Sequence, residues 1–247
     1  MIPETPSIIQ TLSRWRKEPL VSFSSVVALN LLAATHQRFS RRFALVCFVV
    51  LPMLSASTAA ILWWSEHKYE YIPKRWGIVV PGLIYRSGQL TPELLGQTLE
   101  EHGITTIIDL QLNDLEDPHL QWEMQYAAAR RLRHFRFGLG GDGTGDVDRY
   151  VDAVAVLIEC VRENQPVLVH CAAGTQRTGG VVACYRLLAE EAEPQEVYRE
   201  LKKYDWEPGD DGEVVDYLNT HLSTIAKRLV ERGVLAQVPA EIPQLGK

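Results

Sequence analysis

The chain has 247 residues, of which 46% are hydrophobic and 23% are charged, enough for one globular domain of ordinary size together with an appendage. Its net charge of −6 is unevenly distributed along the chain. Residues 1–64 hold six basic and two acidic side chains, so the rest of the chain carries a net charge of −10. An acidic main domain argues against nucleic acid as a partner, and four scattered cysteines with no Cys-x-x-Cys pair argue against a zinc site or a disulfide scaffold.

An uncharged run of 22 residues, 43–64, is the first element that the pattern indicates. As a transmembrane helix it would be about 33 Å long, enough to cross the hydrocarbon core of a bilayer. Three arginines within residues 38–42 favour a cytoplasmic segment 1–42 and a single-pass anchor, with the following domain on the non-cytoplasmic, periplasmic side. A signal peptide cleaved near 55–60 is one alternative, and a buried soluble helix is another.

After a linker, 65–78, strand-like apolar runs alternate with helical stretches, which is typical of an α/β domain with a central, mostly parallel sheet flanked by helices. We expect this domain to span 79–234 and to be followed by a flexible tail, 235–247. The expected strands are 82–87, 104–110, 133–139 and 167–170. The expected helices are 91–103, 119–132, 149–163, 178–191, 194–204 and 212–233.

The stretch "VLVHCAAGTQRTGG", 167–180, is the candidate site. Cys171 ends an expected strand and Thr178 begins an expected helix, so the loop between them lies at the carboxyl edge of the sheet, where α/β folds bind ligands. Backbone N–H groups of a tight loop that leads into a helix N-terminus form an anion site, and small residues let the backbone approach a phosphate. The expected phosphate-binding residues are Ala172, Ala173, Gly174, Thr175, Gln176 and Arg177.

Two side chains of this loop carry its chemistry. The guanidinium of Arg177 can bind two phosphate oxygens at once, which a lysine cannot do. The same positive surroundings favour the thiolate of Cys171, the nucleophilic form of a cysteine. The competing interpretation is a buried, inert cysteine followed by a chance arginine.

The run "HCAAGTQRTG" resembles the His-Cys-x5-Arg-Thr/Ser signature of the cysteine-dependent protein tyrosine and dual-specificity phosphatases. With "YRSGQL" and "GITTIIDL" upstream, the chain is similar to the compact bacterial dual-specificity-like branch from about residue 82 to about 204. The resemblance implies that Cys171 attacks phosphorus and that water hydrolyses the resulting phosphocysteine, with no metal or cofactor. It also implies that Thr178 donates to the departing sulfur and that His170 orients the loop.

The family supplies an aspartic acid, on a loop before the signature, that protonates the leaving group. Three aspartates lie in the glycine-rich loop 138–148. We favour Asp142, which stands between two glycines directly after an expected strand. Asp146 could instead cap the next helix and Asp148 could lie in its first turn, both ordinary structural uses of aspartate. The chain lacks the family's aromatic-Pro-Asp stretch, so all three remain candidates.

The loop has no charge apart from Arg177, whereas relatives that prefer inositol phosphates often carry lysines there. The expected substrate is therefore a phosphorylated protein, phosphotyrosine first and phosphoserine or phosphothreonine next, or a small phosphomonoester. The alternatives are a phosphoinositide or inositol phosphate phosphatase, an inactive phosphate-binding membrane module and a sulfurtransferase.

The remaining cysteines, histidines and late aromatic residues are expected to have structural or surface positions. Those expected to pack, rather than react or line the pocket, are Cys47, Cys160, Cys184, Tyr204 and Trp206. Those expected on the surface or in loops are His102, His119, His134 and His221.

Overall fold

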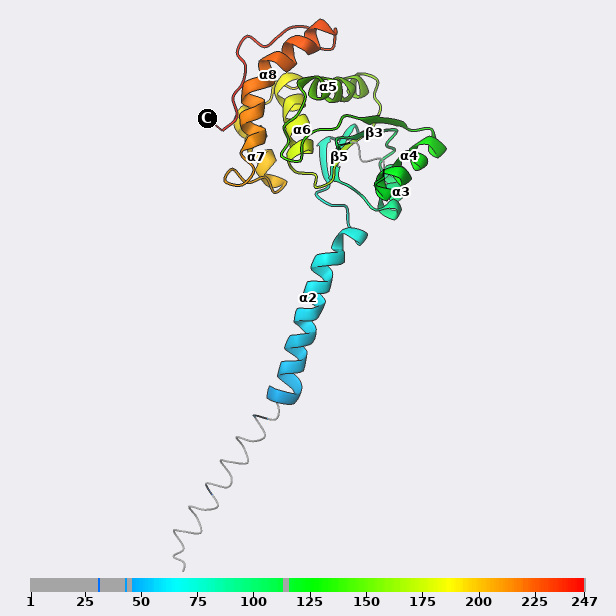
Figure 1. Ribbon diagram of the computed structural model, residues 1–247, viewed down its shortest axis with the longest axis vertical. Coiled ribbons are helices and arrows are strands. Elements are labelled where there is room, and N and C mark those ends of the chain that lie inside the picture. The colour runs from blue at the N-terminus through cyan, green and yellow to red at the C-terminus, as the bar shows by residue number, and fades with distance from the viewer. Residues whose placement is uncertain (1–30, 32–42, 44–45, 113–115, 247) are drawn as a thin grey trace, which may run out of the picture. The chain divides into compact units, whose positions relative to one another are not determined.

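The computed structural model falls into two compact units, Met1–Ser65 and Glu66–Lys247. It describes residues 31, 43, 46–112 and 116–246 (Figure 1).

The apolar run forms one helix, which is a π-helix over Val46–Val50 and the α-helix α2 over Leu51–Tyr71. None of its residues is buried, and by length and composition it could cross a membrane. The proposed cytoplasmic segment, 1–42, lies outside the described residues except at Leu31.

The expected linker, 65–78, differs from the structure at both ends. Helix α2 runs seven residues past Trp64, because the glutamates and the lysine that follow the apolar run are themselves good helix formers. The linker then ends in strand β1 (Gly77–Val80), which sequence reasoning did not predict. Three of its four residues are β-branched and apolar, so a strand signal was present, but the run is short and ends directly before Pro81.

A five-stranded sheet with the order β1-β2-β5-β3-β4 forms the centre of the second unit. The pairs β2–β5, β5–β3 and β3–β4 are parallel, and only β1 runs antiparallel to its neighbour. The expected mostly parallel sheet is therefore confirmed, with each of the four expected strands present. Their bounds are β2 (Ile84–Gly88), β3 (Thr106–Asp109), β4 (Arg133–Arg136) and β5 (Val167–Cys171).

Six helices cover this sheet on two faces (Figure 1). They are α3 (Pro92–Glu101), α4 (Pro118–Arg130), α5 (Val147–Arg162), α6 (Gln176–Leu188), α7 (Pro194–Lys203) and α8 (Glu213–Glu231). Val167 and Val169 of β5 pack into the large cluster with α5 to α8, whereas Leu168 packs into the smaller cluster with α3 and α4. This alternation follows from the period of two in a strand, and it places β5 in the middle of a three-layer domain.

The C-terminal segment, expected to be a flexible tail, packs against the domain near its end. Leu245 is buried, its N–H donates to the Asn219 side-chain oxygen (2.8 Å), and its carbonyl accepts from the Asn219 amide (3.1 Å). One apolar side chain and a paired amide thus fix this segment to α8, which corrects the expectation.

Candidate active site

The candidate loop joins the carboxyl end of β5 to the amino end of α6, and Cys171 is the last residue of the strand. Its side chain is buried, and its sulfur accepts a hydrogen bond from the Gly174 N–H (3.1 Å). Burial opposes ionisation of the thiol. The adjacent Thr178 hydroxyl, the charge of Arg177 and the amides of Gly174 and Thr178 outweigh it, so the pKa of Cys171 is below its ordinary value.

The loop packs so closely on the end of β2 that two positions require glycine. Gly174 has a φ of +82°, and a Cβ there would lie 2.5 Å from the Gly88 nitrogen. A Cβ on Gly88 would lie 2.7 Å from the Ala173 carbonyl oxygen. The first loop carbonyl, that of Ala172, accepts from the Gln89 N–H (3.3 Å). The strand that pairs with β5 therefore also fixes the path of the loop.

Two arginines from outside the loop bind its carbonyl groups. Arg86 of β2 is fully buried, donates through Nη2 to the Gly174 carbonyl (2.7 Å), and lies over the ring of Tyr204 at 3.8 Å. Burial lowers the pKa of Arg86 to about 10, so it stays cationic at neutral pH. Arg75 donates through Nη1 to the Ala173 carbonyl (2.8 Å). Because the arginines bind these carbonyl oxygens, the N–H groups of the loop are the backbone groups that remain to bind an anion.

Tyr204 and Trp206 lie in the interior of the domain, in agreement with the expectation that they pack rather than line the pocket. They are only 6% and 2% exposed. Tyr204 contributes to the site indirectly, as the surface on which Arg86 rests.

Arg177 lies in the first turn of α6, one residue before Thr178. Its Nε is buried and has no hydrogen-bond partner among the described residues. Its charge lowers the pKa of both Cys171 and Asp142, so it lies within electrostatic range of both side chains. A buried cationic donor without a partner is a group that an oxyanion would satisfy.

The three candidate aspartates have different surroundings. Asp146 caps α5 and accepts from the Asp148 N–H (2.9 Å), and the Asp148 carboxylate pairs with Arg228. Asp142 is exposed in the glycine-rich loop and accepts from the N–H and the hydroxyl of Thr144 (2.9 Å each). These bonds, with a further contribution from Arg177, lower the pKa of Asp142. Asp146 and Asp148 thus have the structural roles expected of them, whereas the pKa of Asp142 is affected by the charge of Arg177.

A buried acid and two histidines form a chain behind the loop that sequence reasoning did not identify. Glu123 of α4 accepts through Oε1 from the Nε2 of His134 (2.8 Å) and faces the Nε2 of His170 at 3.2 Å. The expectation that His134 lies on the surface is wrong: its side chain is 12% exposed, because α4 covers β4 there. A signal existed, since Glu123 is a charged residue in line with Leu120 and Ala127 on the buried side of α4.

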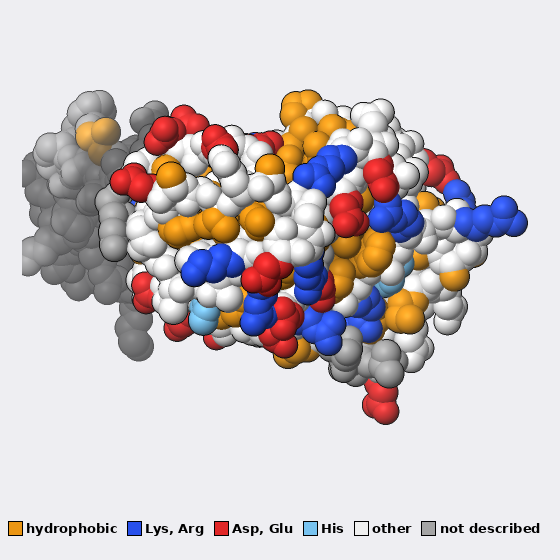
Figure 2. All heavy atoms as spheres, turned by 90° about the horizontal axis from the view of Figure 1, so that it is seen from above, with side chains coloured by type: hydrophobic (Ala, Val, Ile, Leu, Met, Phe, Trp, Pro, Cys, Tyr) orange, Lys and Arg blue, Asp and Glu red, His pale blue; other side chains and the backbone are white. Residues whose placement is uncertain are grey.

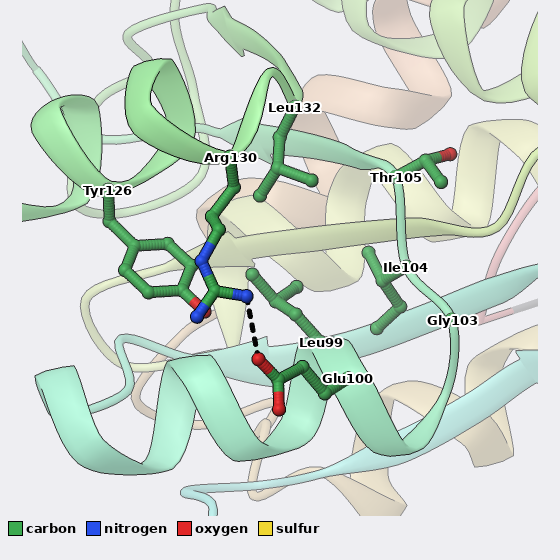
Figure 3. A pocket seen from close by; sticks show the side chains of 8 residues that line it. All are labelled: Leu99, Glu100, Gly103, Ile104, Thr105, Tyr126, Arg130 and Leu132. Carbon is green, nitrogen blue, oxygen red and sulfur yellow. Dashed lines mark hydrogen bonds and ion pairs between the residues drawn. The ribbon is translucent and has the colours of Figure 1, made fainter.

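One surface pocket borders this loop, and another lies at the opposite edge of the sheet. A depression of about 250 Å³ reaches the loop at Ala172, and its walls include Glu66, Glu70, Lys74 and His119. A second pocket, of about 230 Å³, lies at the opposite, amino end of β3, where the Arg130–Glu100 ion pair spans Leu99, Ile104 and Leu132 (Figure 3). In the described part of the chain, no group of three or more His, Cys, Asp or Glu side chains is arranged to hold a metal ion.

Residues 81–214 match the family model described as "DSP-PTPase phosphatase fused to NAD+ Kinase". The chain belongs to this family of dual-specificity-type phosphatases. It is 30% identical over 118 residues to the inositol diphosphatase DSP3 of Arabidopsis thaliana, covering 46% of this chain and 54% of the relative. It is 49% identical over 45 residues to the dual specificity protein phosphatase OPG106 of Vaccinia virus, covering 18% of this chain and 26% of the relative. The chain thus matches about half or less of the length of these relatives.

Solved structures show the same fold. The catalytic domain of the PP-IP phosphatase SIW14 from S. cerevisiae superposes with a TM-score of 0.52 at 21% identity, over 66% of this chain and 95% of the other. TpbA of P. aeruginosa superposes with a TM-score of 0.51 at 19% identity, over 64% and 91%. The match to the family model confirms the phosphatase family inferred from the loop, while the bacterial branch stays a prediction.

Proposed function

We propose that this phosphatase hydrolyses phosphomonoesters through a covalent phosphocysteine at Cys171. The proposal is carried by one observation: a thiol with a lowered pKa accepts from a loop amide, and the Nε of Arg177, whose charge contributes to that lowering, is buried with no partner among the described residues. A thiolate and a set of preorganised cationic and N–H donors are what attack on a phosphate dianion requires.

In the first step the thiolate of Cys171 attacks phosphorus while the bond to the ester oxygen breaks. Asp142 gives its proton to that oxygen, and the loop amides and Arg177 hold the phosphoryl oxygens. In the second step water attacks phosphorus and the sulfur–phosphorus bond breaks. Asp142 takes the proton of the water, and the Thr178 hydroxyl stabilises the released thiolate. The products are the alcohol and inorganic phosphate.

Asp142 must hold a proton at the start of this reaction, and its surroundings in the free protein favour the carboxylate. The hydrogen bonds from Thr144 are the larger cause and the charge of Arg177 a smaller one. A phosphate dianion bound at Arg177 would offset that positive charge and so favour the protonated form. Substrate binding and protonation of the acid are therefore coupled in this scheme.

The preferred substrate that we propose is protein phosphotyrosine, with phosphoserine and phosphothreonine after it. Inside the loop the only charged side chain is that of Arg177. The depression that starts at Ala172 carries Glu66 and Glu70 beside Lys74 and His119, so it has no surplus of positive charge for further phosphates. Figure 2 shows one face of the molecule, on which acidic and basic side chains are interspersed.

Inositol phosphates are the second candidate substrate class. The relative from Arabidopsis thaliana is named an inositol diphosphatase, and so are two further relatives, at 36% identity over 76 residues and 30% over 109. This candidate predicts faster release of phosphate from an inositol polyphosphate than from a phosphopeptide.

The test is a substrate panel on the full chain in detergent, with Cys171→Ser as the matched control. We expect kcat/KM to be highest for phosphotyrosine peptides, lower for phosphoserine and phosphothreonine peptides, and lowest for inositol polyphosphates. The control should release no phosphate from any of them. The reverse order would favour the inositol phosphate assignment. Turnover by Cys171→Ser would contradict the cysteine mechanism itself.

We also propose that residues 43–64 anchor the chain as a single pass, with the phosphatase domain on the non-cytoplasmic side. The exposed apolar helix α2 and the arginines before it support this proposal. The test is protease digestion of intact and permeabilised spheroplasts. The domain should be cut in both, and protection in intact spheroplasts would contradict the orientation.

A further inference from the structure

Glu123 is a charged side chain in the interior of the domain. Its side chain is 5% exposed, on the face of α4 that packs against the sheet. Removing a carboxylate from water costs several kcal/mol in effective terms, and such a group persists only when it is paired and hydrogen-bonded. The position therefore calls for partners, and the structure supplies two.

Both partners meet the same carboxylate oxygen, Oε1. The Nε2 of His134 lies 2.8 Å away and that of His170 lies 3.2 Å away. The His170 side chain is 2% exposed and directly precedes Cys171 in β5. Burial by itself would lower the pKa of His170. The charge and hydrogen bond of Glu123, with smaller contributions from Asp109 and Cys171, instead raise it to about 9.

Other charged groups around His170 do not replace Glu123. Asp109, on the neighbouring strand β3, is hydrogen-bonded to Arg136 (Nε to Oδ2, 3.1 Å) and to the Gln111 N–H. Arg86 of β2 and Arg177 of α6 are cations that act on Cys171. Among the described residues, the carboxylate in hydrogen-bonding contact with the imidazole of His170 is that of Glu123.

We propose that Glu123 is a positioning residue, which keeps the ring of His170 cationic and oriented and thereby favours the thiolate of Cys171. The proposal rests on the proposed role of Cys171 as nucleophile. It links α4, on one side of the sheet, to the reacting sulfur through a single histidine. Without the carboxylate, the buried imidazole would be neutral near pH 7, and the sulfur would lose a neighbouring positive charge.

The experiment compares the full chain, in detergent, with its Glu123→Gln variant, which keeps the side-chain size and can still hydrogen-bond. The pH dependence of iodoacetamide alkylation, followed by mass on the peptide that contains Cys171, reports the thiolate directly. We expect the midpoint to rise by about one pH unit in the variant, which makes alkylation about tenfold slower at a pH well below both midpoints. The acid limb of kcat/KM should move by the same amount.

His134→Gln is the matched control, because it changes the other partner of Glu123 and leaves the His170 contact in place. Its alkylation midpoint should equal that of the wild type. The proposal is overturned if Glu123→Gln keeps the wild-type midpoint and loses activity equally at every pH, since Glu123 would then only hold α4 on the sheet. A change in His134→Gln as large as that in Glu123→Gln would also overturn it.

A measurement on the wild type covers the case in which Glu123→Gln does not fold. In ¹⁵N spectra of the histidine side chains, both ring nitrogens of His170 should remain protonated up to about pH 9. A neutral His170 ring at pH 7 contradicts the proposal. A wild type that hydrolyses no phosphomonoester would instead contradict the proposed function, while the alkylation midpoints would still report on Glu123.

Discussion

In the proposed mechanism, the charge of Arg177 has opposite consequences for Cys171 and Asp142, although it shifts the two pKa values in the same direction. It lowers the pKa of Cys171, which favours the nucleophile, and it also lowers the pKa of Asp142, which disfavours an acid. A lowered pKa suits the buried sulfur, which reacts as a thiolate, but it removes the proton that the exposed carboxyl group has to donate. In the proposed mechanism Cys171 attacks and leaves as the anion, whereas Asp142 needs the substrate's negative charge to regain its proton.

The first prediction concerns the acid. Asp142→Asn keeps an oxygen that can accept from Thr144, so the turn should persist while the proton donor is lost. We expect kcat for phenyl phosphate to fall about 100-fold or more, and kcat for para-nitrophenyl phosphate, with its better leaving group, to fall much less.

Asp146→Asn is the control for this prediction, because asparagine caps a helix about as well as aspartate. It should change neither rate by more than a few-fold. If Asp146→Asn shows the dependence on the leaving group and Asp142→Asn does not, the acid has been assigned to the wrong residue.

At the scale of elements, the site depends on the contact between the candidate loop and the end of β2. The backbone at 174 is left-handed, and Gly88 approaches the loop too closely for any side chain at either position. This contact also places the Gly174 N–H on the sulfur of Cys171. The register between β2 and β5, in which Gly88 pairs with Cys171, is therefore part of the geometry of the proposed active site.

Gly174→Ala tests this dependence. The added methyl would require the backbone to move, at a cost of about 1–3 kcal/mol in the free energy of unfolding, and the amide would leave the sulfur. We expect a lower melting temperature, slower alkylation of Cys171 below pH 7 and a loss of most activity. Gly209→Ala is the matched control, since a Cβ there meets nothing within 4 Å. Equal effects in the two variants would show that the contact has no special role.

The elements that sequence reasoning predicted are those with strong local patterns. The parallel strands, the helices that follow them and the loop after β5 each have a continuous apolar run or a capping residue, such as Thr91 before α3. Edge strand β1 and the chain from Glu123 to His170 were missed for two different reasons. Strand β1 is a run of only four residues, and Glu123 and His170 are 47 positions apart, so that their contact gives no joint pattern in one sequence.

At the scale of the whole molecule, the two units have different surfaces. Both hydrophobic clusters of the second unit are built from residues after Arg75. The part of the apolar helix that lies in the first unit, from Val46 to Ser65, buries none of its residues. The phosphatase unit therefore has a complete core without the first 65 residues.

This division predicts that a fragment starting at Glu66 folds by itself. It should be monodisperse without detergent, melt cooperatively and keep the kcat/KM of the full chain for para-nitrophenyl phosphate. Size-exclusion chromatography, circular dichroism and a steady-state assay check these three properties in turn. A fragment that aggregates, or that folds but is inactive, would show that the preceding residues contribute to the core or to the site.

The most direct test of the account is detection of the phosphoryl group on the protein. The full chain is mixed with substrate, quenched in acid within milliseconds and digested, and the peptide masses are measured by mass spectrometry. We predict one phosphoryl group on the peptide that contains Cys171, and none in Cys171→Ser. A phosphoryl group on any other residue, or turnover with no phosphoenzyme at any time, would contradict the assignment of Cys171 as the nucleophile.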